Sequence, residues 1–479
     1  MPTARATRGP FALSASDRAR LRERVERAIG LARRVGGRCL ASITTRLDSS
    51  VDPCAVVVAS RATDERWFCF EQPERAASAL AALGSAADLE ARGTDRFSEL
   101  GARWRTLVAQ AIADPPDGPP GAGPVAVGGF AFAPDGGDSP AWTGFAAASL
   151  TLPALSFARR GGDTRMTINA MAGADDLTDQ MLDRVESRLE GLRAEPLPLL
   201  DPDPAEPSRV RSAMPPEHYE EAVDRAAQRI RSGELDKLVL AREVQVITAH
   251  PHDPGAVFGV LRDAFPGCFV FAVGRGQSTF LAASPELLIR REGLRASTLA
   301  LAGSMRRSAD PAVDDHLGEQ LLQSEKDREE HAIVVRRIRA TLKRAAVWVT
   351  AAEEPVLARM ANIQHLATPI RAQLADPVGA VELAGRLHPT PAVGGDPVDR
   401  SLPLIPALEG LDRGWYAGPV GWIDANEDGE FCVALRCSLL ADRLARCYAG
   451  VGVVRDSDPR AELAETEVKF AALLPVLAA

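Results

Sequence analysis

The sequence predicts an α+β fold, because its strand-like and helix-like segments are grouped rather than alternating. Short apolar segments at 268–274, 278–283, 286–291 and 295–301 are separated by tight turns such as "GRGQS". This pattern is typical of an antiparallel sheet. A long helix is expected after these strands, over 314–345. Such grouping favours the α+β class over a doubly wound parallel sheet.

Further elements are expected along the rest of the chain. They are helices over 16–34, 176–193, 216–232 and 459–474, and strands over 125–134, 237–246, 418–424, 430–440 and 446–453. Prolines interrupt residues 193–217 and exclude a regular helix there. We therefore divide the chain into an N-terminal half, residues 1–205, and a C-terminal half, residues 206–479. The proline-rich segment is either a linker between them or a long loop over one continuous fold.

Composition limits the possible functions. The 479 residues carry a net charge of −9, with 46% hydrophobic and 25% charged residues, which is ordinary for a soluble globular protein. Because no Lys/Arg-rich block occurs, a nucleic-acid partner is not expected. Neither a secretion signal nor a membrane-spanning segment is recognisable, which favours a cytoplasmic protein without a membrane partner. The seven cysteines form no C-x-x-C pair, so we expect reduced thiols rather than disulfides or a zinc ribbon.

A lysine opens the apolar strand "KLVLAR". Strand side chains alternate between faces, so Lys237 shares a face with Val239. A buried ammonium group is costly unless it is paired or loses its proton. Lys237 is therefore either a strand-end residue that reaches water or a base with an adjusted pKa.

A glutamate occupies a similar position in "SPELLIR". Glu286 alternates with Leu287 and Ile289 in an expected strand. Apolar neighbours raise the pKa of a carboxyl group, which can then act as a general acid near neutral pH. The alternative is an edge-strand glutamate that faces solvent.

Two expected helices each carry a pair of carboxylates at i, i+3 spacing. Asp327 and Glu330 lie on one helix, and Glu462 and Glu465 lie on the other. Each helix alone could be a charged solvent face, and Glu465 with Lys469 could form a surface ion pair. Together, however, the four carboxylates suggest an oxygen-rich site suited to Mg²⁺. Zinc is disfavoured, because no His or Cys has a suitable spacing with them.

Glycines and an arginine lie in apolar strands near the C-terminus. Gly450 and Gly452 in "YAGVGVV" would let backbone amides approach a ligand, although the dinucleotide-binding spacing is missing. Arg436 in "FCVALRCSLL" is a cation suited to binding a carboxylate through two hydrogen bonds.

These motifs occur together and in order, and as a set they resemble the chorismate-utilising enzymes, most closely the isochorismate synthases. The motifs are "KLVLAR", "SPELLIR", "LALAGS", "SEKDREEH", "QHLATPI", "LHPTPAVGG", "GWYAGPVGW", "ALRCSLL", "YAGVGVV" and "ETEVK". The N-terminal half is similar more loosely, through "WFCFEQPE" and "GGFAFAP". The resemblance implies a Mg²⁺-dependent enzyme with a large chorismate-binding fold. In that fold, two antiparallel sheets pack face to face and helices flank them.

The resemblance also implies residue roles. Lys237 would be the general base and Glu286 the general acid. Glu330 and Glu465 would bind the metal, with Glu462 and Asp327 beside them or holding metal-bound water. The substrate-binding set would be Arg436, Lys469, Gly450, Gly452, His365, Ala302, Gly303 and Ser304.

The implied reaction is attack of water on C2 of chorismate with loss of the C4 hydroxyl, which gives isochorismate. A free lysine, with a pKa of about 10.4, is a poor base at neutral pH, and apolar surroundings lower that value. Anthranilate synthases lack the lysine found at position 237, and the aminodeoxychorismate branch carries a lysine where this chain has Ala302. Water is therefore the expected nucleophile, and a glutamine amidotransferase subunit is not expected.

Two alternatives stay open. A salicylate synthase shares the lysine and then eliminates pyruvate from isochorismate. A non-catalytic chorismate-binding regulator would need none of the catalytic residues. The pathway served (menaquinone, siderophore or salicylate) is not visible in the sequence.

Overall fold

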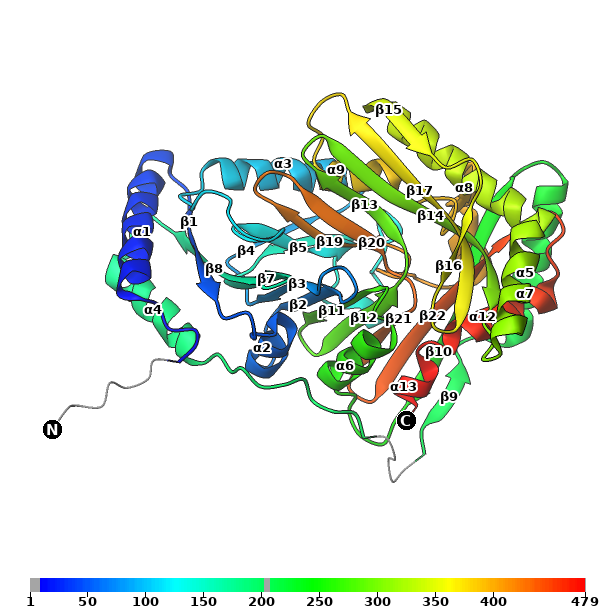
Figure 1. Ribbon diagram of the computed structural model, residues 1–479, viewed down its shortest axis with the longest axis horizontal. Helices are drawn as coiled ribbons and strands as arrows, with labels where there is room; N and C mark the ends of the chain where they lie inside the picture. The colour runs from blue at the N-terminus through cyan, green and yellow to red at the C-terminus, as the bar shows by residue number, and fades with distance from the viewer. Residues whose placement is uncertain (1–8, 202–206, 479) are drawn as a thin grey trace.

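The chain forms two large β-sheets surrounded by helices, as seen in a computed structural model that describes residues 9–201 and 207–478 (Figure 1). Neighbouring strands within both sheets run antiparallel, as in the pairing of β10 with β22 and of β14 with β17. The expected α+β class, with two antiparallel sheets and flanking helices, is confirmed.

The first sheet has 12 strands. In spatial order these are β1 (Cys39–Leu47), β8 (Asp163–Ala172), β7 (Leu155–Arg160), β3 (Ser78–Leu83), β2 (Trp67–Gln72), β11 (Phe269–Arg275), β12 (Ser278–Ser284), β21 (Cys437–Ala441), β22 (Leu444–Val453), β10 (Lys237–Ile247) and β18 (Gly395–Asp396), and β9 (Arg209–Ser212) also pairs with β10.

The second sheet has 10 strands. In spatial order these are β15 (Ala346–Ala351), β17 (Ile363–Leu374), β14 (Arg295–Arg306), β13 (Leu287–Glu292), β20 (Gly429–Val433), β19 (Pro419–Asp424), β5 (Val125–Phe130), β6 (Ala148–Leu152) and β4 (Ala87–Ala91), and β16 (Val356–Arg359) also pairs with β17.

Both halves of the sequence contribute strands to both sheets. β2 of the N-terminal half pairs with β11, and β5 pairs with β19. Hydrogen bonds of the sheet ladders therefore connect the halves. The boundary drawn at residues 205 and 206 lies outside the described residues, as do Pro202 and Pro204 of the proline-rich segment.

Helices cover the sheets and fill their ends. They are α1 (Ala15–Val35), α2 (Pro53–Ser60), α3 (Arg96–Ala109), α4 (Thr178–Glu190), α5 (Pro216–Arg231), α6 (Pro254–Ala264), α7 (Pro311–Gln323), α8 (Glu325–Lys343), α9 (Ala380–Leu387), α10 (Val398–Ser401), α11 (Leu404–Glu409), α12 (Pro459–Phe470) and α13 (Leu474–Leu477), with a short 3₁₀ turn η1 (Pro140–Trp142).

The hydrophobic core has two layers. In the first cluster, which contains residues of both sheets, aromatic side chains interlock, for example Trp142 with Phe280 at 5.2 Å between ring centroids and Phe130 with Phe431 at 6.0 Å. On the other face of the first sheet, residues of α1, α2 and α6 such as Val25, Val57 and Phe258 form a second cluster. Each side chain of this size stabilises the fold by roughly 1.5–3 kcal/mol when fully buried.

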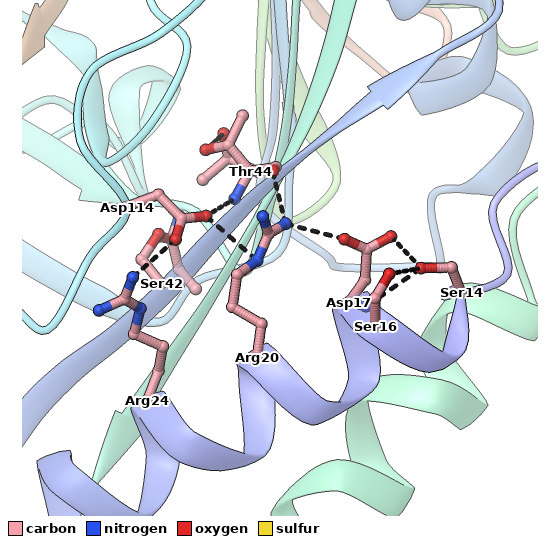
Figure 2. Close-up of polar contacts among 10 residues, drawn as sticks. Ser14, Ser16, Asp17, Arg20, Arg24, Ser42, Thr44 and Asp114 are labelled. Atoms are coloured by element: carbon pink, nitrogen blue, oxygen red, sulfur yellow. Dashed lines mark hydrogen bonds and ion pairs between the residues drawn. The ribbon is translucent and has the colours of Figure 1, made fainter.

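The expected basic helix near the N-terminus is α1, and its arginines bind the sheet. Arg24 donates to Asp114 at 2.9 Å, and Arg20 lies 3.6 Å from the other oxygen of the same carboxylate. That oxygen also accepts from the Thr44 amide of β1 at 2.9 Å (Figure 2). Asp114 therefore joins the helix to the strand.

Three expected elements differ from the structure. The helix expected over 314–345 is two helices, because the Ser324 side chain caps α8 by accepting from the Asp327 amide at 3.3 Å. The strand expected over 430–440 is also interrupted, and its two parts, β20 and β21, belong to different sheets. The last helix ends at Phe470, and a separate turn of helix, α13, follows.

Candidate active site

A cavity of ≈80 Å³ brings together most of the predicted site residues. It is lined by Glu286, Ala302, Gly303, Ser304, Glu330, His365, Arg436, Gly450, Gly452, Glu465 and Lys469 of the predicted set. Lys237, Asp327 and Glu462 are not among its lining residues. A larger cavity of ≈350 Å³ lies elsewhere, around Arg75 and Glu430, and contains none of the predicted residues.

Lys237 begins β10 and is fully buried. Its Nζ lies 2.8 Å from Glu330 Oε1 of α8. Gly452, on the neighbouring strand β22, makes room for this pair, because a Cβ there would lie 2.2 Å from Glu330 Oε1 and 2.8 Å from Lys237 Cε. The interpretation of Lys237 as a strand-end residue that reaches water is therefore wrong. The amine is paired inside the protein, beside the cavity.

Glu286 lies where the chain crosses from one sheet to the other. β12 belongs to the first sheet and β13 to the second, and Glu286 precedes β13 rather than lying within it as expected. The Glu286 carbonyl accepts from the Val433 amide at 3.0 Å. Only 4% of Glu286 is exposed, and burial raises the pKa of its carboxyl group to about 8, against the opposing charges of Lys237 and Lys469.

Arg436 lies at the neighbouring crossing, between β20 and β21, and not inside a strand as expected. Its φ is +50°. Its Nη2 contacts His365 Nε2 at 2.9 Å, while His365 Nδ1 lies 3.1 Å from the Gly303 carbonyl. Burial, with Arg436 and Lys469 nearby, lowers the pKa of His365, so the ring is neutral. A neutral ring that donates from Nδ1 to Gly303 can accept from Arg436 and hold the guanidinium in place.

Crossing between sheets explains why two charged residues can sit in apolar segments. Within a strand, alternate side chains point to opposite faces. At a crossing the backbone leaves both ladders, so a polar side chain can enter the space between the sheets without facing a packed layer. Glu286 and Arg436 both use this position.

The predicted metal-binding carboxylates come from α8 and α12, and three of them are paired with lysines. Lys237 binds Glu330, Lys326 binds Glu462 and Lys469 binds Glu465, each at 2.8 Å. The i, i+4 pair of Glu465 and Lys469 is therefore present, although it lies at the cavity and not on an outer face. Asp327 accepts from the Ser324 hydroxyl at 2.5 Å at the start of α8.

Electrostatics differ among these acids. Burial raises the pKa of Glu462 despite Lys326, and burial also raises the pKa of Asp327 despite the Ser324 hydroxyl. For Glu465, burial acts in the same direction, but Lys469, Lys326 and Ser304 together outweigh it and lower its pKa. Glu465 is therefore better prepared to carry a negative charge than Glu462 or Asp327.

The donor chemistry fits a magnesium ion. Within residues 9–201 and 207–478, no three His, Cys, Asp or Glu side chains form a ready-made metal cluster. Mg²⁺ needs fewer protein ligands, since it usually takes one or two carboxylates and completes its shell with water and substrate oxygens. Glu330 and Glu465 line the same cavity from two helices and provide such a pair.

Backbone features also shape the cavity. Gly450 has no room for a side chain, because a Cβ would lie 2.8 Å from both the Leu240 carbonyl and the Tyr416 hydroxyl. Lys469 Nζ donates to the Gly450 carbonyl at 2.9 Å. Gly303 has a φ of +72° at a bulge in β14 and packs against Asp327.

Sequence reasoning missed several cavity residues. They are Val239, Pro285, Leu301, Ala392, Val393, Tyr416, Leu435, Tyr448 and Ala449. Tyr416 and Tyr448 stack with ring centroids 5.3 Å apart. The motifs "GWYAGPVGW" and "LHPTPAVGG" contain Tyr416, Ala392 and Val393, and a role for these residues could have been sought there. The remaining residues also lie within quoted motifs, but their side chains carry no charge that would have singled them out.

Comparison with known proteins identifies the family. The profile of the family described as chorismate binding enzyme matches residues 25–478. The chain belongs to this family.

Within the described residues, none of the helices combines the length and the apolar character needed to cross a bilayer.

Among the members of this family, the chain is similar to several isochorismate synthases. The chain is 37% identical over 459 residues to the salicylate biosynthesis isochorismate synthase of Pseudomonas aeruginosa, covering 96% of this chain and 94% of the relative. It is 32% identical over 468 residues to the isochorismate synthase MenF of Bacillus subtilis, covering 95% and 97%. The solved structure of the menaquinone-specific isochorismate synthase MenF from Escherichia coli superposes with a TM-score of 0.77 at 25% identity, covering 94% and 99%.

Proposed function

We propose that this protein is an isochorismate synthase, an isomerase that converts chorismate into isochorismate. The observation that carries the proposal is that a buried glutamic acid lines the cavity and a buried lysine, Lys237, lies beside it. Lys237 begins β10, Glu286 lies at the crossing between β12 and β13, and the charge of Lys237 acts on Glu286. Full-length similarity to isochorismate synthases supports the same reaction.

The two residues divide the proton transfers. We assign Lys237 to accept a proton from water while the water oxygen bonds to C2 of chorismate. Glu286 gives its proton to the C4 hydroxyl, which leaves as water while the ring double bonds shift. One water enters and one leaves, so the reaction is an isomerisation. With a pKa of about 8, Glu286 holds the required proton at neutral pH.

Cations and amides would bind the substrate. Chorismate carries two carboxylates, and Arg436, Lys469 and the amides around Gly450 and Gly452 are the groups we assign to them. His365 holds Arg436, and Ala302, Gly303 and Ser304 form the adjoining wall.

We further propose Mg²⁺ as the cofactor, held by Glu330 and Glu465, with Asp327 and Glu462 beside them. When bound, the ion would supply positive charge to a substrate carboxylate and draw electrons from the ring. Its binding would require Glu330 and Glu465 to exchange lysine contacts for metal contacts.

Other parts of the proposal concern partners and location. The lysine at position 237 and Ala302 support water as the nucleophile, so no glutamine amidotransferase subunit is needed. A cytoplasmic enzyme is consistent with seven free cysteines, all of them buried. We assign the N-terminal half the role of completing both sheets.

Product analysis tests the function. Purified protein is incubated with chorismate and Mg²⁺ at neutral pH, and the products are separated by liquid chromatography with mass detection. Isochorismate as the main product supports the proposal, and Lys237→Ala should abolish its formation. Salicylate and pyruvate as the main products would instead make the protein a salicylate synthase. Tight chorismate binding without any product would indicate a non-catalytic regulator.

A further inference from the structure

The strand that carries Lys237 has an incomplete edge. One edge of β10 pairs with β22 from Leu238 to Ile247. The other edge pairs with β18 only at Lys237 and Leu238, and with β9 only from Val244 onward. Within the described residues, no strand covers positions 239–243 on this side, although the Val239 amide donates to the Gly394 carbonyl at 2.8 Å and the Glu243 carbonyl accepts from the Ala213 amide at 2.9 Å.

Two charged side chains fill this gap. Arg413 Nη2 donates to the Val239 carbonyl at 2.9 Å, and the Ala241 amide donates to Glu409 Oε1 at 2.7 Å. The two side chains also bind each other, through Arg413 Nε to Glu409 Oε2 at 3.0 Å and through Nη2 to Oε1. They offer one donor and one acceptor to β10, as a neighbouring strand would.

The same guanidinium reaches two other walls of the cavity. Arg413 Nη1 donates to the Val393 carbonyl at 2.8 Å, in the loop after α9. The guanidinium also lies over the rings of Phe132 at 4.3 Å and Tyr416 at 5.6 Å. Val239, Val393 and Tyr416 all line the cavity, so one side chain contacts three of its walls.

Stability alone is a weak explanation for this pair. The side chains of Arg413 and Glu409 are only 3% and 1% exposed. Desolvating two charges costs about as much as their attraction returns, and apolar replacements of such pairs are often neutral or stabilising. Geometric definition of the contacting backbone is a benefit that an apolar pair would not give.

We propose that Arg413, held by Glu409, is a positioning residue that fixes β10, and with it Lys237, against the Val393 and Tyr416 walls. Its effect on catalysis rests on the proposed function, whereas its effect on β10 does not. Arg413 touches neither the predicted base nor the predicted substrate contacts. Its removal should therefore change the placement of Lys237 more than the binding of substrate.

The test variant is Arg413→Lys, which keeps the charge and the pairing with Glu409 but loses the forked geometry. We expect kcat for isochorismate formation to fall by about tenfold or more, because small misplacements of a catalytic group are costly. KM for chorismate should change by less than about threefold. Arg291→Lys is the matched control, since Arg291 is also buried and holds Asp428 and the Asn426 carbonyl, at 2.7 and 2.6 Å, away from the cavity.

Amide hydrogen exchange provides a readout that needs no substrate. In Arg413→Lys, peptides covering residues 238–244 should exchange roughly tenfold faster than in the wild type, and in Arg291→Lys they should not. Glu409→Gln retains an acceptor for the Ala241 amide and should give a smaller increase. These comparisons hold whether or not the wild type forms isochorismate, so failure of the proposed function would be visible separately.

Two results would overturn the proposal. One is unchanged exchange of residues 238–244 in folded Arg413→Lys. The other is a kcat loss no larger than that of Arg291→Lys. If Arg413→Lys does not fold, Glu409→Gln carries the same test through exchange and kcat, with the same overturning results.

Discussion

The charged network at α1 and the charged network at the cavity differ in how far they are exposed to solvent. At α1, Arg20, Arg24 and Asp114 remain 37%, 18% and 13% exposed, so they keep part of their hydration (Figure 2). At the cavity, the Lys237 side chain is 0% exposed and that of Glu330 is 12% exposed. The exposed ion pairs at α1 have a small desolvation penalty and contribute little to stability. The buried pair at the cavity has a large desolvation penalty.

This contrast indicates where function lies. Partly hydrated ion pairs that join a helix to a strand are explained by local stability. Several buried charges around one cavity are not, because an apolar core would be at least as stable. Substitutions in the two networks should therefore separate into loss of turnover and loss of stability.

The largest effect is expected for Lys237→Met. Removal of the general base should lower turnover by roughly 10³–10⁴-fold, measured as isochorismate formed per enzyme. Glu330 would lose its buried partner, so unfolding free energy should also fall by about 3 kcal/mol. Circular dichroism establishes that the variant is folded at the assay temperature. Turnover above a tenth of the wild-type value would contradict the assigned role.

A smaller loss, roughly 10²–10³-fold, is expected for Glu286→Gln. Since Glu286 is the proposed general acid and has a pKa of about 8, wild-type kcat/KM should fall tenfold per pH unit above this value. The glutamine variant should lack this alkaline decline. An identical decline in both proteins would assign it to another group.

Stability should show the same titration. The folded pKa of Glu286, about 8, lies above its ordinary value of 4.5, so the folded state keeps a proton that the unfolded state loses. The wild-type unfolding free energy, relative to that of Glu286→Gln, should therefore be highest below about pH 4.5 and fall as pH rises toward 8. Denaturant titrations at several pH values measure this difference.

Glu465→Gln should act on the metal. We expect the affinity for a divalent ion to fall by about 10–100-fold, measured as Mn²⁺ binding by electron paramagnetic resonance and as the Mg²⁺ dependence of turnover. Glu467→Gln is a control on the same helix, because Glu467 binds Arg242 and lies outside the cavity. Equal metal affinities in the two variants would rule out the assignment.

Asp114→Asn should have the smallest effect of these substitutions, and it should lower stability and not turnover. Weakened contacts to Arg20, Arg24 and Thr44 should lower unfolding free energy by about 1–2 kcal/mol in urea titrations. Both kcat and KM should remain at wild-type values. A change in either would show that the N-terminal network reaches the active site.

Local sequence predicted much of the site but little of its placement. The motifs identified Glu286 and Arg436. The apolar segment that contains Arg436 was nevertheless predicted as one strand, because period-two alternation does not reveal which sheet each part joins. Ser324 and Asp327 form a Ser-x-x-Asp motif that indicates the start of a helix. The break between α7 and α8 was nevertheless not predicted, because charged residues continue across it. Val393 and Tyr416 lie in quoted motifs, but only the folded chain shows that these distant segments meet at the cavity.

Similar limits apply to the N-terminal half. Strands such as β2 and β3 are buried on both faces, so their sequences lack the alternation that marks a half-exposed strand. Their partners lie far away in sequence, as β2 pairs with β11. The contribution of this half to both sheets could not be derived from local patterns.

The two adjacent crossings between the sheets, at Glu286 and at Arg436, are held together by main-chain hydrogen bonds. Glu286 accepts from the Val433 amide at 3.0 Å, and the Arg436 carbonyl accepts from the Ala283 amide at 3.1 Å. Hydrogen bonds between backbones therefore hold the main chain at the proposed proton donor and at the proposed carboxylate-binding arginine. Random mutagenesis of lining residues could alter affinity and product partition while these main-chain contacts stay constant. Accepting a substrate of different length would require a change in the spacing of the sheets themselves.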